Sequence, residues 1–145
     1  MEWENLKRAK YDGRLNDIGR SPEVAQKYYN FNQKTRAKYR STTDHIFINV
    51  FKCPSYHIGN KLAAQERPAW DSVRFTLNRF PYNVDAHHFL VWFGSKQAQA
   101  IFLREGDVRK MLPGQLRDRE FFIHINEPKF KTIPDIEHLH LFVKK

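Results

Sequence analysis

The spacing of apolar residues changes near residue 71, and this change constrains the fold more than any other feature of the chain. Before it, apolar residues recur every three or four positions, as on one face of a helix. After it, they alternate with polar residues, which is typical of strands that bury one face. Helices followed by strands predict an α+β domain, and 145 residues suffice for a single one.

The first 52 residues predict helices. A short amphipathic helix is expected over 2–12. Ser21-Pro22-Glu23 combines an N-cap, a proline at the first helical position and an acid in the first turn, so a second helix begins there. Its apolar face runs from Val24 to Tyr39. Residues 41–51 fit either a strand or a helix, and the capping residues Thr43-Asp44 favour a helix.

The second half predicts an antiparallel sheet of roughly four strands with the N-terminal helices packed on it. Its expected order is β-β-α-β-β: strands over 72–80, 88–93, 120–126 and 136–143, and a broken helix over 97–103 and 107–112. Residues 129–135, which include Pro134, predict a loop. In this single domain, 1–145, we expect residues 53–70 to form a loop between the helical part, 1–52, and the sheet part, 71–145.

Histidines concentrate on one predicted face of this sheet. Alternation places His88 and Trp92 on one side of their strand, and His138 and His140 on one side of the last strand. The opposite sides are apolar and should face the core helices. If the two strands are neighbours, three imidazoles and an indole converge, and the same alternation lets His124 join them.

Four interpretations of the histidine face remain open. His-x-His on a strand points two rings the same way, as in metal sites, but no carboxylate or cysteine supports one, so a His-only metal site is a weak signal and no cofactor is expected. Imidazoles also serve acid–base catalysis. A phosphate-bearing ligand could bind there with Arg79, Arg74 or Lys129, and stack on Trp92. The rings could instead be hydrogen-bonded packing partners.

Several classes of protein are excluded or disfavoured. The single cysteine, Cys53, excludes an internal disulfide and a cysteine-based zinc site. No phosphate-binding glycine loop, nucleophile elbow or His-Glu-x-x-His motif occurs. No apolar stretch approaches a membrane span, and the acidic start is unlike a targeting signal. We therefore expect no membrane partner, and a cytoplasmic or nuclear protein.

The net charge of +9, with 14% aromatic residues, favours anionic partners. One alternative function is therefore nucleic-acid binding, or a structural role in a particle or ribonucleoprotein, through the basic face of the second helix. The candidate residues for that role are Lys34, Arg36, Lys38 and Arg40.

Several short blocks resemble the N-acetylglucosamine-induced protein family of fungi and large DNA viruses. The opening Trp3–Lys7, the Arg20-Ser21-Pro22 block, and Pro81-Tyr82 followed by the His88-x-x-x-Trp92 spacing all resemble it. Further blocks do so as well: Arg14-Leu15, Tyr39-Arg40-Ser41, Asn126-Glu127-Pro128, Ile133-Pro134 and His138-Leu139-His140. Phe80 stands where the family is expected to have Trp, and Glu127 interrupts the usual Asn-Pro-Pro.

The resemblance implies a site but no reaction, because the family's name records induction by an amino sugar. It directs attention to positions that alternation had already selected. The hypothesis is that His88, His138 and His140 serve acid–base chemistry or contact an anion in a small molecule that carries phosphate or sugar. Tyr82 and Trp92 would then shape the site, Asn126 would orient the ligand and Arg79 would supply charge. A viral member of the family would be located in the virion.

Overall fold

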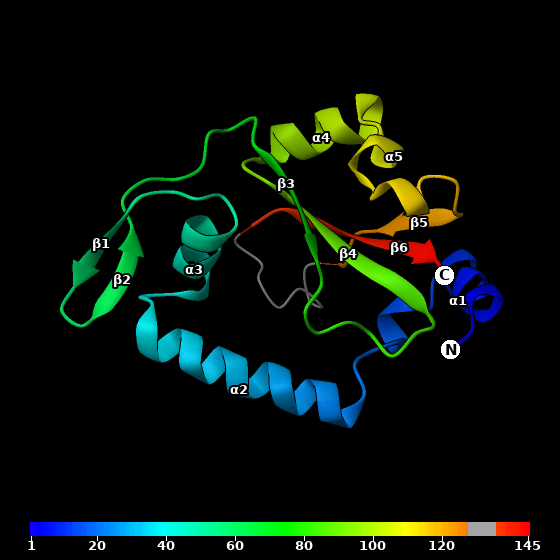
Figure 1. The fold of residues 1–145 in the computed structure, drawn as a ribbon, viewed down its shortest axis with the longest axis horizontal. Coiled ribbons are helices and arrows are strands. Elements are labelled where there is room, and N and C mark those ends of the chain that lie inside the picture. The colour runs from blue at the N-terminus through cyan, green and yellow to red at the C-terminus, as the bar shows by residue number, and fades with distance from the viewer. Residues whose placement is uncertain (128–135) are drawn as a thin grey trace.

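The computed structural model describes residues 1–127 and 136–145. Helices come first: α1 (Trp3–Tyr11), the 3-10 turn η1 (Leu15–Asp17), α2 (Pro22–Lys38) and α3 (Thr42–Asn49). The remaining elements are β1 (Ser55–Ile58), β2 (Lys61–Ala64), β3 (Val73–Leu77), β4 (Ala86–Phe93), α4 (Lys96–Glu105), α5 (Val108–Met111), the 3-10 turn η2 (Gly114–Leu116), β5 (Phe121–His124) and β6 (His138–Lys144). The predicted α+β class and β-β-α-β-β second half are confirmed (Figure 1).

The central sheet is antiparallel, with strand order β3-β4-β6-β5. One face of it packs on α4, α5 and η2 through the apolar sides of β4 and β6, which include Phe89, Val91 and Leu141. The other face, which carries the histidines, is covered by the N-terminal helices (Figure 1). The sheet is therefore the middle layer, and its histidine face is enclosed.

The N-terminal helices begin where the capping chemistry predicts, with one correction. Ser21 accepts a hydrogen bond from the Val24 amide at the start of α2. The helix over 41–51 is confirmed, but its N-cap is Ser41, not Thr43-Asp44. The Ser41 hydroxyl accepts from the Asp44 backbone N–H at 3.0 Å. Asp44 thus lies inside the first turn, and its carboxylate is available for another contact.

The loop predicted over 53–70 is wrong for part of its length, because β1 and β2 form an antiparallel hairpin there. Gly59-Asn60 connects the strands, and Gly59 adopts a positive φ of 61°. A glycine at the first position of a two-residue turn produces the twist that a hairpin requires. The strands are only four residues each, so the glycine, asparagine and charges around them obscured the pattern. The loop predicted over 129–135 lies outside the described residues.

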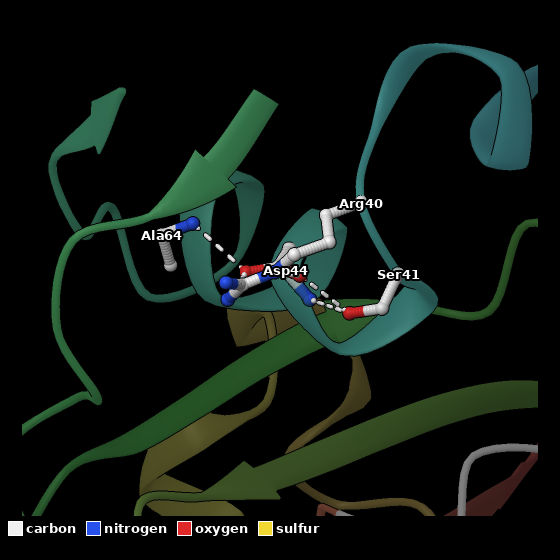
Figure 2. Close-up of polar contacts among 4 residues, drawn as sticks. All are labelled: Arg40, Ser41, Asp44 and Ala64. Atoms are coloured by element: carbon white, nitrogen blue, oxygen red, sulfur yellow. Dashed lines mark hydrogen bonds and ion pairs between the residues drawn. The ribbon is translucent and has the colours of Figure 1, made fainter. Parts of the chain in front are cut away.

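A buried carboxylate joins the hairpin to the helices. Asp44 accepts two hydrogen bonds from Arg40, at 2.8 and 2.9 Å, and one of 2.6 Å from the Ser41 hydroxyl. Its Oδ1 also accepts from the backbone N–H of Ala64 in β2, at 2.9 Å (Figure 2). Burial alone would raise the pKa of Asp44, but the three donors outweigh it and lower that pKa to about 2.

The Asp44→Asn substitution is expected to lower the free energy of unfolding by about 2 kcal/mol at pH 7, because the carboxylate has a lower pKa folded than unfolded. The stability that ionised Asp44 supplies is complete above pH 4 and is lost as the pH falls toward 2. Urea denaturation of both proteins at pH 7 and pH 3 measures this difference, and a deficit that does not shrink at pH 3 would contradict the assignment.

Candidate functional site

Pairing of β4 with β6 brings the predicted site residues together. The register sets Trp92 opposite His138 and Leu90 opposite His140. The rings of Trp92 and His138 have centroids 4.9 Å apart. His88, His138 and His140 are only 2%, 5% and 5% exposed, so the rings lie under the N-terminal helices and not on a half-exposed sheet face.

Part of this set forms a closed hydrogen-bonded network. Nε2 of His88 lies 2.8 Å from Nδ1 of His140, and Nε2 of His140 lies 3.1 Å from the amide of Asn126. The Asn126 amide also lies 3.2 Å from the Tyr82 hydroxyl. The Tyr82 ring lies against both histidines, with centroids 4.7 and 5.3 Å away.

The backbone fixes the protons of this network. The Tyr82 N–H donates to Nδ1 of His88 at 3.2 Å, so this nitrogen carries no proton. A neutral His88 therefore donates from Nε2 to His140, which in turn carries its proton on Nε2. The oxygen and nitrogen of a side-chain amide have nearly the same shape, so the Asn126 amide can be turned by 180° without moving its neighbours. In that orientation the Asn126 oxygen accepts the proton on Nε2 of His140, and the chain of hydrogen bonds is complete.

Both histidines of the pair are neutral at pH 7. Burial, reinforced by the Arg20 cation, lowers the pKa of His88 to about 3. Burial is also the largest cause for His140, whose pKa falls to about 2 with contributions from the neighbouring histidines and Arg20. Neither ring supplies positive charge to an anion, and their hydrogen bonds within the network use both ring nitrogens of each.

A cavity of about 280 Å³ lies beside this network, between the histidine face of the sheet and helices α2 and α3. The sheet contributes Trp92, His138 and His140 to its wall. Helix α2 contributes Tyr28 and Phe31, whereas α3 contributes other lining residues: Thr42, His45 and Asn49. His140 thus belongs to both the network and the cavity, while His88 lies behind the wall.

Two arginines line the cavity, and each lies on an aromatic ring of α2. The Arg20 guanidinium is 4.0 Å from the Tyr28 ring centroid, and its Nε donates to the Phe80 carbonyl at 2.7 Å. The Arg79 guanidinium is 4.8 Å from the Phe31 centroid. Among the described residues, no carboxylate pairs with either arginine, and no Asp or Glu lines the cavity.

This charge acts inside the cavity. Burial lowers the pKa of the lining residue His45, and the cations of Arg79 and Lys38 lower it further.

Hydrogen bonds also fix the orientation of two rings in the cavity wall, those of His138 and Trp92. Nδ1 of His138 lies 2.8 Å from the Ile136 carbonyl, which can only accept, so the proton sits on Nδ1 and Nε2 is the basic nitrogen. Nε1 of Trp92 donates to the Thr76 hydroxyl at 2.9 Å.

The structure therefore divides the predicted site residues. Arg79, Trp92, His138 and His140 line the cavity, whereas His88, Tyr82 and Asn126 form the supporting network. His124 is half-buried, 6.4 Å from His140 between ring centroids. Arg74 lies near Phe51 and outside the cavity, and Lys129 falls outside the described residues.

Sequence reasoning missed most of the opposite wall. Arg20, His45 and Asn49 come from other elements, and no periodicity relates them to the strands. Thr76 and Asn78 could have been found, because they alternate with the apolar residues of β3 and so must share one face of it. Among the described residues, no group of three or more His, Cys, Asp or Glu is arranged to hold a metal ion. No described helix has the length and apolarity needed to cross a membrane.

Acid is expected to destabilise the protein through the His88–His140 pair. Both histidines take up protons more readily when unfolded, so the free energy of unfolding falls as the pH drops from about 6.5, by up to about 1.4 kcal/mol per pH unit for each ring. Urea denaturation at pH 7, 6 and 5 measures the slope, and His140→Gln should reduce it. A wild-type free energy that is flat over this range would contradict the assignment.

Comparison with known proteins supports the fold and places the chain in a family. A crystal structure of the protein HTC1 superposes with a TM-score of 0.67 and 18% sequence identity, covering 99% of this chain and 85% of that chain. At this identity the likeness concerns the fold alone. No curated protein matches the chain. The family described as "Protein of unknown function (DUF3605)" matches residues 2–144, and the protein therefore belongs to it.

Proposed function

We propose that the cavity binds a small molecule that carries a phosphate group. The observation that carries this proposal is the pair of lining arginines, Arg20 and Arg79, in a wall whose described residues include no acid. Unpaired guanidiniums attract anions strongly, and their planar donor sets fit phosphate oxygens in a bidentate manner. A wall whose described residues include cations and no carboxylate therefore favours an anionic ligand over a neutral or cationic one.

The arginines are restrained before a ligand arrives. Arg20 is held by the Tyr28 ring and the Phe80 carbonyl, and Arg79 lies over Phe31. The two α2 rings in turn contact Phe80, each with a centroid distance of 5.2 Å. Side chains that are already ordered lose less entropy on binding, so these contacts favour affinity.

The rest of the wall suits a hydroxyl-bearing body such as a sugar. Neutral amides and hydroxyls supply donors and acceptors, including Asn49, Asn78 and Thr42, while Trp92 and Leu90 supply an apolar surface. A volume of about 280 Å³ is at the lower limit of typical ligand sites, roughly 300–1,000 Å³, so the ligand is the size of a sugar phosphate.

The histidines then take different roles from one another. His138 is the candidate acid–base group, because it lines the cavity and its Nδ1 proton is held by the Ile136 carbonyl, which fixes the tautomer of the ring. His88 and His140 are neutral and hydrogen-bonded, so we assign them to positioning the wall. If the bound molecule reacts, by hydrolysis or by group transfer, His138 is the residue assigned to move the proton; binding itself does not require it.

The resemblance to the N-acetylglucosamine-induced protein family supports the sugar part of this proposal. The Pro81-Tyr82 and His88-x-x-x-Trp92 blocks of that resemblance surround the cavity or its supporting network. An N-acetylhexosamine phosphate is therefore the first compound to test.

Isothermal titration calorimetry with inorganic phosphate, an N-acetylhexosamine phosphate, a nucleotide sugar and the free sugar tests the proposal. At least one phosphate-bearing compound should bind, and Arg79→Gln should weaken it about tenfold or more, since a charged hydrogen bond contributes roughly 1.5–3 kcal/mol. Arg79 is exposed, so this variant should fold.

The matched control is Arg104→Gln, which removes the same charge from the exposed side of α4, away from the cavity. It should bind as the unsubstituted protein does. The proposal fails if none of the four compounds binds, if the free sugar binds as well as its phosphate, or if Arg79→Gln and Arg104→Gln give equal affinities.

A further inference from the structure

The net charge of the protein is unevenly distributed along the chain. Residues 33–67, all of which the structure describes, contain seven Lys and Arg against two Asp and Glu, a net charge of +5 out of +9. One of the two acids, Asp44, is buried and neutralised by Arg40. Within this segment Glu66 is thus the remaining exposed carboxylate, so the segment that contains the end of α2 and the β1–β2 hairpin is strongly basic.

The structure divides the basic residues that the sequence had grouped on the second helix. Lys38 lies on the flank of α2 that faces the cavity, where it lowers the pKa of His45, and Lys34 is one turn before it. Arg40 turns the other way, to Asp44 and the Tyr56 hydroxyl of β1. Arg36 is exposed in the last turn of α2, which ends at Lys38, and Figure 1 shows the hairpin beside that end of the helix. Of the four candidates, Arg40 therefore contacts the hairpin and Arg36 lies at the end of α2 next to it.

We propose that this second surface, defined by Arg36, Arg40, Tyr56, Lys61 and Arg67 and called the hairpin surface, binds single-stranded nucleic acid. Figure 1 shows β1 and β2 beside the end of α2, away from the four-stranded sheet. Tyr56 and Ile58 share one side of β1 and are 41% and 43% exposed. Exposed aromatic and apolar side chains among cations favour an unpaired strand, whose bases can stack while the phosphates meet Lys and Arg.

The cations of this surface are available to phosphates. Among the described residues, no carboxylate forms an ion pair with Arg36, Lys61 or Arg67. Arg67 lies 6.0 Å from the Phe47 ring centroid and lines a pocket at the base of the hairpin together with Arg40 and the two acids of the segment, Asp44 and Glu66. None of the five residues lines the cavity, so this proposal is independent of the proposed ligand site.

Fluorescence anisotropy with a labelled 16-nucleotide RNA and the DNA of the same sequence, at 50 and 200 mM salt, tests the proposal. Binding should weaken as salt rises, because cations that meet phosphates release counterions. Arg36→Gln, Lys61→Gln and Arg67→Gln combined should reduce the affinity at least about tenfold. They should also reduce the slope of log K against log salt by about 2, near 0.7 for each phosphate that is no longer neutralised.

The matched control combines Lys96→Gln, Arg104→Gln and Lys110→Gln, which remove the same charge from exposed positions on and around α4 and α5. It should bind as the unsubstituted protein does. Equal losses of affinity in the two triple variants would show attraction by net charge alone and would overturn the proposal, as would undetectable binding at 50 mM salt.

A second pair of variants tests stacking. Tyr56→Ala should weaken binding about fivefold or more, since stacking of a base on an aromatic ring contributes roughly 1–3 kcal/mol. Tyr56→Phe keeps the ring, removes the hydroxyl that meets Arg40, and should retain affinity. Equal losses of affinity in both variants, equally tight binding of a duplex, or equal competition by a poly-glutamate of matched charge would each overturn the assignment to single-stranded nucleic acid.

Discussion

Antiparallel pairing of β4 with β6 is the constraint on which the rest of the structure depends. Its register sets apolar side chains on one face of the sheet and histidines with Trp92 on the other. A shift of one residue would reverse both faces and expose Phe89 and Val91 on the wrong side. The buried histidine pair, the cavity wall and the packing of α4 and α5 all require this single register.

Burial decides the chemistry of the histidines more than their number does. His88 and His140 have lost access to water, and their pKa values fall. The Tyr82 amide donates to Nδ1 of His88, so His88 donates its own proton to His140, and His140 in turn meets the Asn126 amide. Among the described lining residues, the cationic side chains are instead Arg20 and Arg79. The histidine cluster therefore forms part of the hydrogen-bonded wall of the cavity, and the positive charge at that wall belongs to the arginines.

Local sequence patterns predicted the layers of this fold well, but they did not predict which residues from different elements come into contact. Alternation found the strands and placed His88, Trp92, His138 and His140 on one face, because side-chain direction in a strand follows from spacing alone. The hairpin at β1 and β2 was missed because four-residue strands give too short a pattern. Arg20 and His45 were missed because their position depends on how α2 and α3 lie on the sheet. The burial of the histidines was missed for the same reason.

The short helix α3 contacts the β1–β2 hairpin on one side and lines the cavity on the other. Asp44 points to Arg40 and the β2 backbone, while the next residue, His45, lines the cavity. A helix of eight residues has little freedom to turn one side without the other. The length and pairing of the hairpin are therefore tied to the shape of the cavity, so substitutions that accumulate in one are expected to be accompanied by compensating substitutions in the other.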